Sequence, residues 1–543
     1  MTSRQFDYII VGAGSSGCVL ADRLSADGKS TVLLIEAGGD NETELVNMPR
    51  AFMKMFGNPT HFWHFPIKEQ AGRPAGEVWP YGRGLGGSSS TNGTWYLRGM
   101  PADYDGWAQA GNSEWKWSEI SRCFGEMESY RGAGANSTRG RDGPLQVTQL
   151  PYRSPAIAAT IEAGVEMGLP RLADINTPGT TGIGYTQATV SRRGRRASSY
   201  QAFLKPAMRR ANLTVMTDTL VESVALDGSR ANGVRIRTAT GPQTIAAARE
   251  VILSAGALQS PKLLQLSGIG PASVLKAAGV PVRHDLAAVG RNLADHAMFS
   301  MSFRLNGDKG VNHQFSGWRI MKHVLQYYLT RKGLMAYTSP EVTALLSSTG
   351  RTDWPDIQFG VGPFSMRSHE EMKADPGRGA LEDRPGITVN AIALRPKSRG
   401  SVSIRSAEVG DMIDVDANWW GDPADKAFLT EMVRLVRRYM RQPALSRFVG
   451  EEVVPGTAVE SDEEIGKALE WLTSPGVHAT GTCRMGDAGD SVVDGRLRVH
   501  GIDGLRVVDC SVMPVPPAGN TNGPAMVIGW RAAELILEDR DRG

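Results

Sequence analysis

The chain opens with a short apolar run that stops at glycines. The segment from Phe6 to Val11 is mostly apolar and rich in β-branched residues, which predicts a buried strand. The residues after the glycines place apolar side chains at helical spacing, namely Cys18, Val19, Leu20 and Leu24. A second apolar run, "STVLLIEAG", predicts a strand that ends at Glu36. The opening pattern therefore predicts a strand, a helix and a second strand, which make a βαβ unit.

Strand-like runs return later in the chain. "EVILSAGA" predicts an apolar strand, and "DIQFGVG", "GITVNAIAL" and "GSVSIRS" predict further strands between about Met298 and Val477. An amphipathic helix follows them, with apolar residues on one face and arginines largely on the other: Phe428, Met432, Val436 and Tyr439 or Met440, against Arg434, Arg437, Arg438 and Arg441. We interpret the apolar face as core packing and the arginines as a solvent-exposed face. This region differs from the opening pattern and indicates a second structural unit.

The glycines after the first strand have the spacing of a nucleotide-binding loop. "GAGSSG" places Gly12, Gly14 and Gly17 in the pattern G-x-G-x-x-G. This spacing permits a tight turn, a close approach of the backbone to a pyrophosphate, and close packing of helix on strand. Glu36 lies 19 residues after Gly17, where a carboxylate can bind ribose hydroxyls. The pattern predicts a bound dinucleotide, and the acidic residue favours NAD or FAD over NADP.

A second glycine-rich loop distinguishes between NAD and FAD as the predicted cofactor. NAD enzymes usually continue at once to a third strand and helix, whereas this chain enters a long irregular stretch that contains "GRGLGGSSSTNGTWYLRG", from Gly82 to Gly99. Such a loop brings many backbone amides and hydroxyls together, which suits the long FAD molecule. A flexible linker is the alternative, but a linker would lack bulky residues such as Trp95 and Tyr96. The second loop therefore favours FAD.

Composition and charge exclude several other classes of protein. With 543 residues, of which 41% are hydrophobic, the chain can bury a large core, and its length predicts roughly two to four domains. The 60 basic and 57 acidic residues give a net charge of +3, so nucleic acid is not expected as a partner. The basic segment "SRRGRRASS" has only Tyr200 as an aromatic neighbour, and we interpret it as a solvent-exposed loop or as one that pairs with acidic segments.

The cysteines and histidines indicate neither a disulfide scaffold nor a metal site. The four cysteines, Cys18, Cys123, Cys483 and Cys510, form no CxxC pair, which fits a reducing compartment. His61 and His64 have a metal-like spacing, but no Cys or carboxylate nearby completes a site, so no metal is predicted. The first residues show no signal-peptide pattern, and no 18-residue apolar span follows. We expect a cytoplasmic protein without a transmembrane segment.

Four segments of the chain resemble the glucose-methanol-choline (GMC) oxidoreductases. "GRGLGGSSSTNGTWYLRG" is similar to the first signature of that family, and "GALQSPKLLQLSGIGP" is similar to the second. "DYIIVGAGSSGCVLADRLS" and "LRVVDCSVMPVPPAGNTNGPAMVIG" resemble the N-terminal and C-terminal parts of its members. These segments extend from residue 7 to residue 529 in the order found in the family. The resemblance points to the branch of choline and alcohol dehydrogenases.

The resemblance implies an α/β fold with two domains. A discontinuous, Rossmann-like FAD-binding domain would comprise residues 1–145, 196–297 and 478–543, and a substrate-binding domain with an antiparallel sheet flanked by helices would comprise residues 146–195 and 298–477. The implied FAD-binding residues are Gly12, Gly14, Ser15, Ser16, Gly17, Glu36, Ala37, Leu85, Gly86, Asn92, Gly93, Thr94, Val221, Asp509, Cys510 and Asn522. Some members attach FAD through a histidine in the first signature. Because Thr91 occupies that position, we expect noncovalent FAD.

The resemblance also gives a role to a histidine in "SPGVHATGTCRMG". His478 matches the catalytic base of the family, and Asn520 matches a second site residue that is His or Asn in the family. Alcohol oxidation by a flavin removes a hydroxyl proton and passes a hydride to flavin N5. Imidazole suits the first task at neutral pH, whereas an amide can only donate a hydrogen bond to the developing alkoxide. The expected function is therefore FAD-dependent oxidation of a primary alcohol, with His478 as base and Asn520 as donor.

Several alternatives stay open from the sequence. The same scaffold hosts hydroxynitrile lyases that keep FAD without redox chemistry, and an NAD-linked dehydrogenase is a third possibility. The electron acceptor is oxygen or another oxidant, and the oligomeric state is undetermined. The substrate is a small-molecule alcohol, with an aromatic or otherwise apolar one favoured. Tryptophans that could form an aromatic cage for a quaternary ammonium are Trp63, Trp79, Trp354, Trp419 and Trp420. By the resemblance, Trp63 lies in a loop, "HFWHF", that leads toward the substrate.

Overall fold

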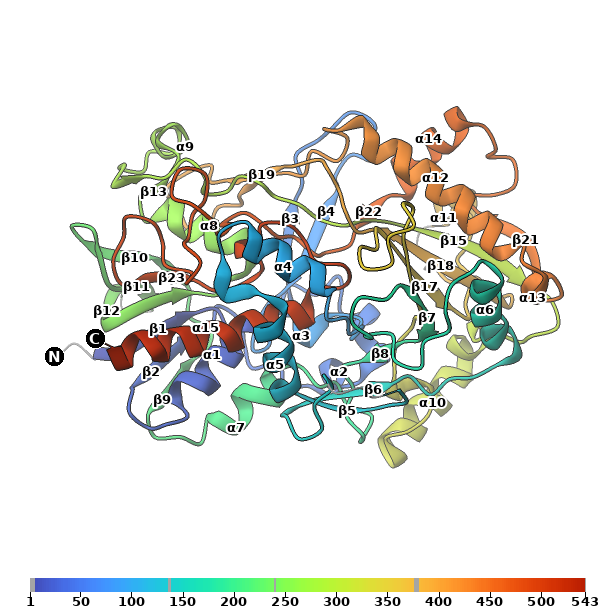
Figure 1. The fold of residues 1–543 in the computed structure, drawn as a ribbon, viewed down its shortest axis with the longest axis horizontal. Coiled ribbons are helices and arrows are strands. Elements are labelled where there is room, and N and C mark those ends of the chain that lie inside the picture. Colours follow the sequence, from blue (N-terminus) through green and yellow to red (C-terminus); the bar gives the residue numbers. More distant parts are fainter. Residues whose placement is uncertain (1–4, 135–137, 239–240, 376–379, 543) are drawn as a thin grey trace.

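Two large sheets, side by side along the long axis of the molecule, organise the fold (Figure 1). The computed structural model describes residues 5–134, 138–238, 241–375 and 380–542. From edge to edge, the first sheet contains β10 (Val221–Asp227), β11 (Arg230–Thr238), β12 (Gly241–Leu253), β1 (Gln5–Val11), β2 (Val32–Ile35) and β9 (Leu213–Met216), and β23 (Leu505–Val507) pairs with β12. The N-terminal strand is parallel to both of its neighbours, β12 and β2.

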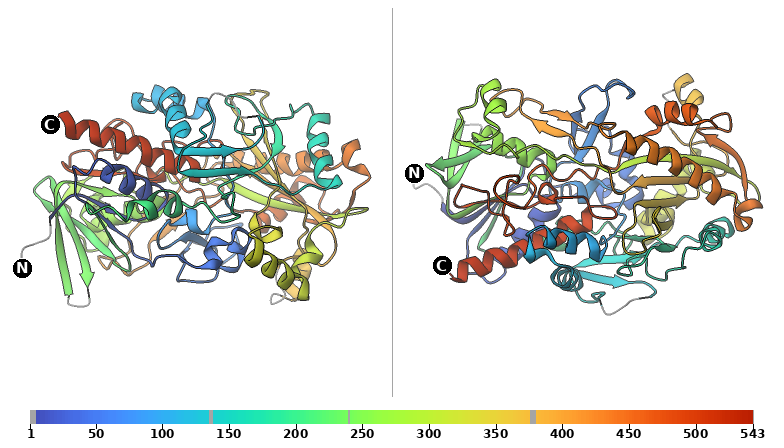
Figure 2. Two further views of the ribbon diagram at one scale, coloured as in Figure 1. Left: turned by 90° about the horizontal axis from the view of Figure 1, so that it is seen from below. Right: turned by 45° about the horizontal axis from the view of Figure 1, so that its top comes forward.

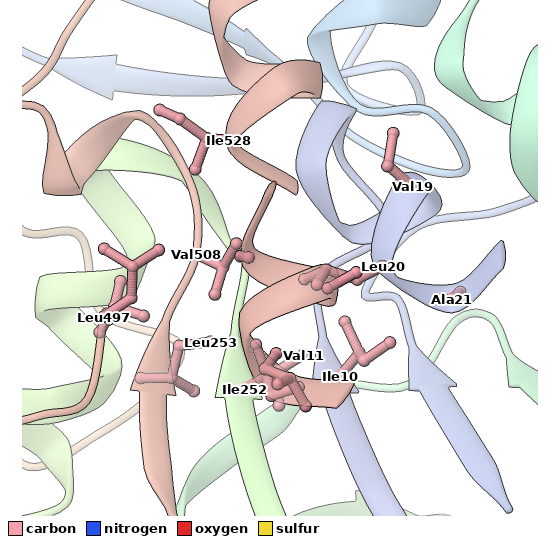
Figure 3. Close-up of a cluster of buried hydrophobic side chains, with 14 of the residues drawn as sticks. Ile10, Val11, Val19, Leu20, Ala21, Ile252, Leu253, Leu497, Val508 and Ile528 are labelled. Carbon is pink, nitrogen blue, oxygen red and sulfur yellow. The ribbon is translucent and has the colours of Figure 1, made fainter. Parts of the chain in front are cut away.

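The central strands of the first sheet are covered on both faces, which explains their continuous apolar sequences. All four residues of β2 are buried. Helix α1 (Ser15–Ser25) connects β1 to β2, and α15 (Asn522–Arg542) packs against α1. Figure 3 shows the resulting core, in which side chains from both ends and from the middle of the chain meet: Ile10, Val11, Leu20, Ile252, Val508 and Ile528. The first sheet is thus completed by the last part of the chain.

The second sheet is antiparallel. Its order is β21 (Val449–Val454), β15 (Ala297–Leu305), β18 (Gly386–Ala393), β17 (Ile357–Gly362), β16 (Val342–Leu346) and β7 (Gly182–Tyr185), and β22 (Ser474–Pro475) pairs with β15. Helices α6 (Pro155–Glu166), α12 (Pro423–Met440), α13 (Pro443–Ser446) and α14 (Asp462–Leu472) lie around it (Figure 1). Met432, Val436 and Tyr439 of α12 are buried, as the apolar face predicts.

Smaller elements connect and cover the two sheets. The helices are α2 (Glu44–Asn47), η1 (Pro49–Lys54), α3 (Ser88–Thr91), α4 (Pro101–Gln109), η2 (Ser113–Trp115), α5 (Trp117–Met127), η3 (Tyr200–Leu204), α7 (Lys205–Ala207), α8 (Gly256–Leu266), α9 (Ala272–Ala277), η4 (Asn312–Phe315), α10 (Gly317–Thr330), η5 (Leu334–Ala336), α11 (His369–Ala374) and η7 (Cys510–Val512). The short strands are β3 (Phe62–Pro66), β4 (Val78–Gly82), β5 (Glu128–Arg131), β6 (Leu145–Gln149), β8 (Gln187–Ala188), β13 (Ile269–Gly270), β14 (His284–Asp285), β19 (Ser401–Ser403) and β20 (Asp414–Asp416). Among the described residues, no helix has both the length and the apolarity that crossing a bilayer requires.

The structure confirms the fold class and corrects one element. The βαβ unit at the start of the chain and the later strands lie where the apolar runs predict them. The segment "HFWHF" was expected to be a loop, but Phe62–Pro66 is strand β3, which forms an antiparallel hairpin with β4. Its partner begins 12 residues later, at Val78, so the pairing is not visible in the local sequence. Hairpins are recognised in a sequence by the residues of their short turns, and this long connection has no such turn.

Candidate active site

One large cavity extends from the first glycine loop to His478. Its volume is about 1350 Å³, above the roughly 300–1,000 Å³ typical of small-molecule sites, so it can hold a long cofactor together with a substrate. Its wall includes Gly12, Ser15, Glu36 and Val221, which lie on or beside strands of the first sheet, and it also includes His478. The first sheet therefore contributes one part of the wall. The second sheet contributes another part through side chains of β15 and β18, namely Met298, Ser300, Asn390 and Ile392.

The glycines of the first loop are required by close contacts. Gly12 has a φ of +101°, and a Cβ there would lie 2.6 Å from the carbonyl oxygen of Ser254. A Cβ on Gly17 would lie 2.0 Å from the carbonyl oxygen of Gly12, so only glycine lets α1 begin so near the strand. The second loop packs on the first, because the Gly86 amide donates to the Ala13 carbonyl over 2.8 Å. The two glycine-rich loops thus form one cradle at the N-terminus of α1.

Glu36 joins the two loops of this cradle. One carboxylate oxygen accepts a hydrogen bond from the Ala13 amide at 2.8 Å. The other oxygen accepts from the amides of Gly38 at 2.9 Å and Gly84 at 3.0 Å. A carboxylate has about four acceptor positions, so one remains for a further donor from the cavity. Glu36 therefore holds the backbone of both loops as well as lining the cavity, a structural role that the sequence did not indicate.

Most of the predicted cofactor-binding residues line the same cavity. These are Gly12, Gly14, Ser15, Ser16, Glu36, Ala37, Asn92, Gly93, Thr94, Val221, Asp509, Cys510 and Asn522. Gly17, Leu85 and Gly86 do not line it and pack behind its wall, with Leu85 part of the apolar core of the first sheet. Burial raises the pKa of the Asp509 carboxyl, and that carboxyl accepts hydrogen bonds from Ser260 and from the backbone amide of Gly256.

Arg196 corrects the interpretation of the basic segment "SRRGRRASS". This arginine is buried rather than solvent-exposed. Its guanidinium donates to the backbone carbonyl of Asn92 at 2.6 Å and to the Asn92 side-chain oxygen at 2.9 Å. The same side-chain oxygen accepts from the Thr94 amide, where the backbone has a left-handed φ of +62°. Arg196 thus fixes the second loop at the cavity. Composition could not distinguish it from the arginines beside it.

His478 and Asn520 meet at the cavity wall. The amide nitrogen Nδ2 of Asn520 donates to Nε2 of His478 over 3.0 Å, and both residues line the cavity. The side-chain oxygen of Asn520 accepts from Nε2 of Gln358 on β17 at 3.1 Å, which sets the orientation of the amide. Because Nε2 of His478 accepts a hydrogen bond, the ring proton of the neutral imidazole lies on Nδ1. The lone pair of Nε2 is therefore the basic position.

A second imidazole holds the other side of this ring. Nδ1 of His478 lies 3.0 Å from Nδ1 of His296, and the two rings are nearly perpendicular at 80°. Since His478 carries its proton on Nδ1, Nδ1 of His296 accepts the hydrogen bond between the two rings. Asp295 accepts a hydrogen bond from the His478 backbone amide at 2.8 Å. The sequence did not single out His296, Asp295 or Gln358, because they are more than 150 residues from their partners.

Burial governs the protonation of this cluster. It lowers the pKa of His478 to about 4, so the imidazole is neutral at pH 7 and can accept a proton. Burial also lowers the pKa of His296 well below its usual range, and the neighbouring His478 lowers it further. The carboxyl of Asp295 is fully buried as well, and desolvation raises its pKa to about 8. The site thus holds two buried, neutral imidazoles, of which that of His478 lines the cavity.

Aromatic side chains make up much of the remaining wall. They include Phe52, Phe56, Phe62, Trp63, Trp95 and Phe364. Of the five tryptophans considered for an aromatic cage, Trp63 lines the cavity, and Trp79, Trp354, Trp419 and Trp420 do not. His61 bonds to the Asn41 side chain and His64 to the Phe56 carbonyl, each over 2.8 Å. Within the described ranges, no cluster of His, Cys, Asp or Glu has the makeup of a metal site.

Comparisons with known proteins agree with this geometry. Two family models described as GMC oxidoreductase match residues 6–298 and 396–529. An oxygen-dependent choline dehydrogenase of Photobacterium profundum is 37% identical over 98% of this chain and 93% of its own length. An alcohol dehydrogenase [acceptor] of Pseudomonas putida is 35% identical over 99% of this chain and 96% of its own. The crystal structure of a pyridoxine 4-oxidase from Mesorbium loti has a TM-score of 0.86 at 31% identity, covering 98% of this chain and 99% of that one.

Proposed function

The chain belongs to the GMC oxidoreductase family and catalyses FAD-dependent alcohol oxidation, and we propose that His478 is its base and Asn520 its hydrogen-bond donor. The observation that carries this proposal is the contact of 3.0 Å between Asn520 Nδ2 and His478 Nε2 at the wall of the large cavity. A base and a neutral donor side by side can engage the two atoms of one hydroxyl group.

The proton follows a short path in this proposal. When an alcohol enters, its hydroxyl proton replaces the Asn520 contact at Nε2 of His478, and Asn520 Nδ2 turns its N–H toward the hydroxyl oxygen. The proton then moves from that oxygen to Nε2. The imidazolium that forms donates from Nδ1 to His296, which fixes the ring during the transfer. Gln358 holds the amide of Asn520 so that its nitrogen faces the reacting oxygen.

The residues of the cradle fit FAD. The cavity reaches the N-terminus of α1, where backbone N–H groups suit a pyrophosphate, and Cβ atoms at Gly12 or Gly17 would collide with the backbone. FAD held in this cradle would supply the acceptor for the hydride of the alcohol. We assign the ribose to Glu36 and the adenine to the backbone of Val221. The pyrophosphate and flavin are assigned to Asn92 and Gly93, and the flavin and ribityl chain to Asp509 and Cys510. The remaining predicted residues that line the cavity complete the site.

FAD is held without a covalent bond in this proposal. Thr91, at the position of the histidine that some relatives use for attachment, lines the cavity, and its hydroxyl is a weak nucleophile compared with imidazole. Precipitation with acid tests this point. Yellow FAD should stay in the supernatant, and a yellow protein pellet would show attachment.

The cavity wall supports an apolar or aromatic primary alcohol as the substrate. Its aromatic side chains offer a large apolar surface, and the two polar side chains that β15 and β18 contribute, Ser300 and Asn390, are hydrogen-bonded to each other at 2.7 Å. The electron acceptor is oxygen or another oxidant, and a cytoplasmic location stays a prediction.

We also propose the domain division given above, since every strand of the first sheet lies in residues 1–145, 196–297 or 478–543.

The visible spectrum of the purified protein tests the function. Under anaerobic conditions a flavin band should bleach when primary alcohols are added, and readmitted air separates an oxidase from a dehydrogenase by the rate at which the colour returns. His478→Ala should keep the flavin band and lose bleaching. If His478→Ala bleached as fast as the wild type, the assignment of the base would be wrong. A band that persists while a cyanohydrin is cleaved would favour the lyase, and folded protein that takes up no FAD would contradict the cofactor.

A further inference from the structure

Helix α10 exposes an apolar face to solvent. Five of the 14 exposed large apolar side chains in the described part of the chain lie on this one helix: Trp318, Met321, Leu325, Tyr328 and Leu329. Their exposed fractions range from 48% to 76%, and their spacing of three and four residues puts them on one face. The helix lies at the edge of the molecule both in Figure 1 and in the view from below in Figure 2. Contiguous exposed apolar surface of this kind marks an interaction site.

The orientation of this face is fixed by the opposite side of the helix. Tyr327 is fully buried in a cluster with Met48 and Ala51 of the segment at η1 and with Met335 and Ala336 of η5. Rotating α10 to hide its exposed residues would pull Tyr327 out of this cluster. The apolar face is therefore a stable feature of the surface.

The apolar face continues into the mouth of the cavity. Tyr328 is half exposed on α10 and also lines the cavity. Met53 and Leu45, from the neighbouring η1 and α2, are likewise both exposed and cavity-lining. Whatever covers α10 therefore also lies at the cavity entrance.

The charges on α10 and on the residues that flank it in the chain have one sign. The segment from residue 309 to residue 340 contains five basic residues and no Asp or Glu: Lys309, Arg319, Lys322, Arg331 and Lys332. Arg331 pairs with Glu44 at 2.6 Å. The side chains of Arg319 and Lys322 are exposed on α10, and the described residues include no ion pair with either of them. Two free cations thus flank the apolar face.

We propose that α10 docks the enzyme on an anionic lipid bilayer, with its apolar face in the boundary between headgroups and acyl chains. A helix with Trp and Leu on one face and only basic charges beside it has the composition of interfacial helices. Anionic headgroups attract the flanking lysine and arginine. A second copy of the chain fits less well, because a two-fold dimer through this face would gather Arg319 and Lys322 of both copies around it, and α10 has no acidic residue to pair with them. Docking in this way turns the cavity mouth toward the lipid.

Flotation of the FAD-loaded enzyme with vesicles tests the proposal. The enzyme should float with vesicles of phosphatidylcholine and phosphatidylglycerol in equal parts, and added salt should weaken the binding. Trp318→Gln/Leu325→Gln/Leu329→Gln should bind about tenfold more weakly or worse, because the apolar insertion is lost. Its control, Val165→Gln/Met208→Gln/Val282→Gln, removes three exposed apolar side chains from other surfaces and should bind as the wild type does.

The charge contribution has its own pair of variants. Arg319→Gln/Lys322→Gln should weaken binding about fivefold for each cation removed. Arg438→Gln/Arg441→Gln, on exposed positions of α12 and its end, lowers the net charge equally and should have little effect. All variants should keep their flavin band, which separates docking from the cofactor site. The proposal is overturned if the wild type does not float, if the α10 triple variant floats as well as the wild type, or if the face instead supports a dimer that the triple variant dissociates.

Discussion

Replacing His296 should slow alcohol oxidation without removing FAD, because His296 positions the base and does not itself line the cavity. In His296→Leu, the Nδ1 proton of His478 loses its acceptor at 3.0 Å, and the ring loses the contact that fixes its tautomer. A hydrogen bond to a charged group contributes about 1.5–3 kcal/mol. Because the imidazolium forms as the proton transfers, this loss falls on the transition state and predicts roughly 10- to 150-fold slower flavin reduction.

Anaerobic stopped-flow measurement of flavin bleaching, over a range of pH, is the appropriate assay. His296→Asn should recover part of the rate, because an amide oxygen can accept the same proton. His500→Leu is the matched control, since His500 bonds to Ser491 and to the Gly486 carbonyl, away from the cavity. If fully flavin-loaded His296→Leu were reduced at the wild-type rate at every pH, His296 would have no part in positioning His478.

Three further results are expected. Asn520→Ala should slow flavin reduction less than His478→Ala does, as measured by the same bleaching assay, because the base remains; the reverse order would contradict the assigned roles. Burial lowers the folded-state pKa of His478 from 6.5 to about 4, so the unfolded chain binds this proton first as the pH falls. Unfolding in denaturant at pH 7 and pH 5 should therefore show that the wild type loses about 2 kcal/mol more stability than His478→Ala does, and equal losses would argue against the low pKa. Arg196→Met should lower FAD retention on gel filtration, with Arg192→Met, an exposed neighbour, as control; equal retention in both would show that the contact with Asn92 does not hold the second loop.

Apolar runs and glycine spacing in the sequence predicted those strands and helices whose formation depends on neighbouring residues in the chain. The βαβ unit follows from apolar runs and from the spacing of Gly12 and Gly17, whose close contacts exclude any side chain. The position of His478 beside Asn520 is consistent with the motif resemblance, although their roles remain a proposal. His296, Asp295 and Gln358 were not predicted, because nothing in their own segments indicates which distant residue they will contact. Arg196 was misassigned for a related reason: burial of one arginine among four is decided by tertiary packing around Asn92.

The place of the C-terminal segment in the first sheet has a consequence for synthesis of the protein. Strand β23 pairs with β12, Ser16 of α1 donates to the Ala525 carbonyl at 2.7 Å, and a Cβ on Gly529 would lie 2.7 Å from the Ser16 carbonyl oxygen. Residues 1–500 are synthesised before α15, the helix that packs on α1, so that apolar core residues of α1 such as Val19 and Leu20 are less well covered until α15 is made. Because Asn522 and Ala525 of α15 also line the cavity, a nascent chain stalled short of α15 presents an incomplete cofactor site together with exposed apolar surface of the kind that chaperones bind.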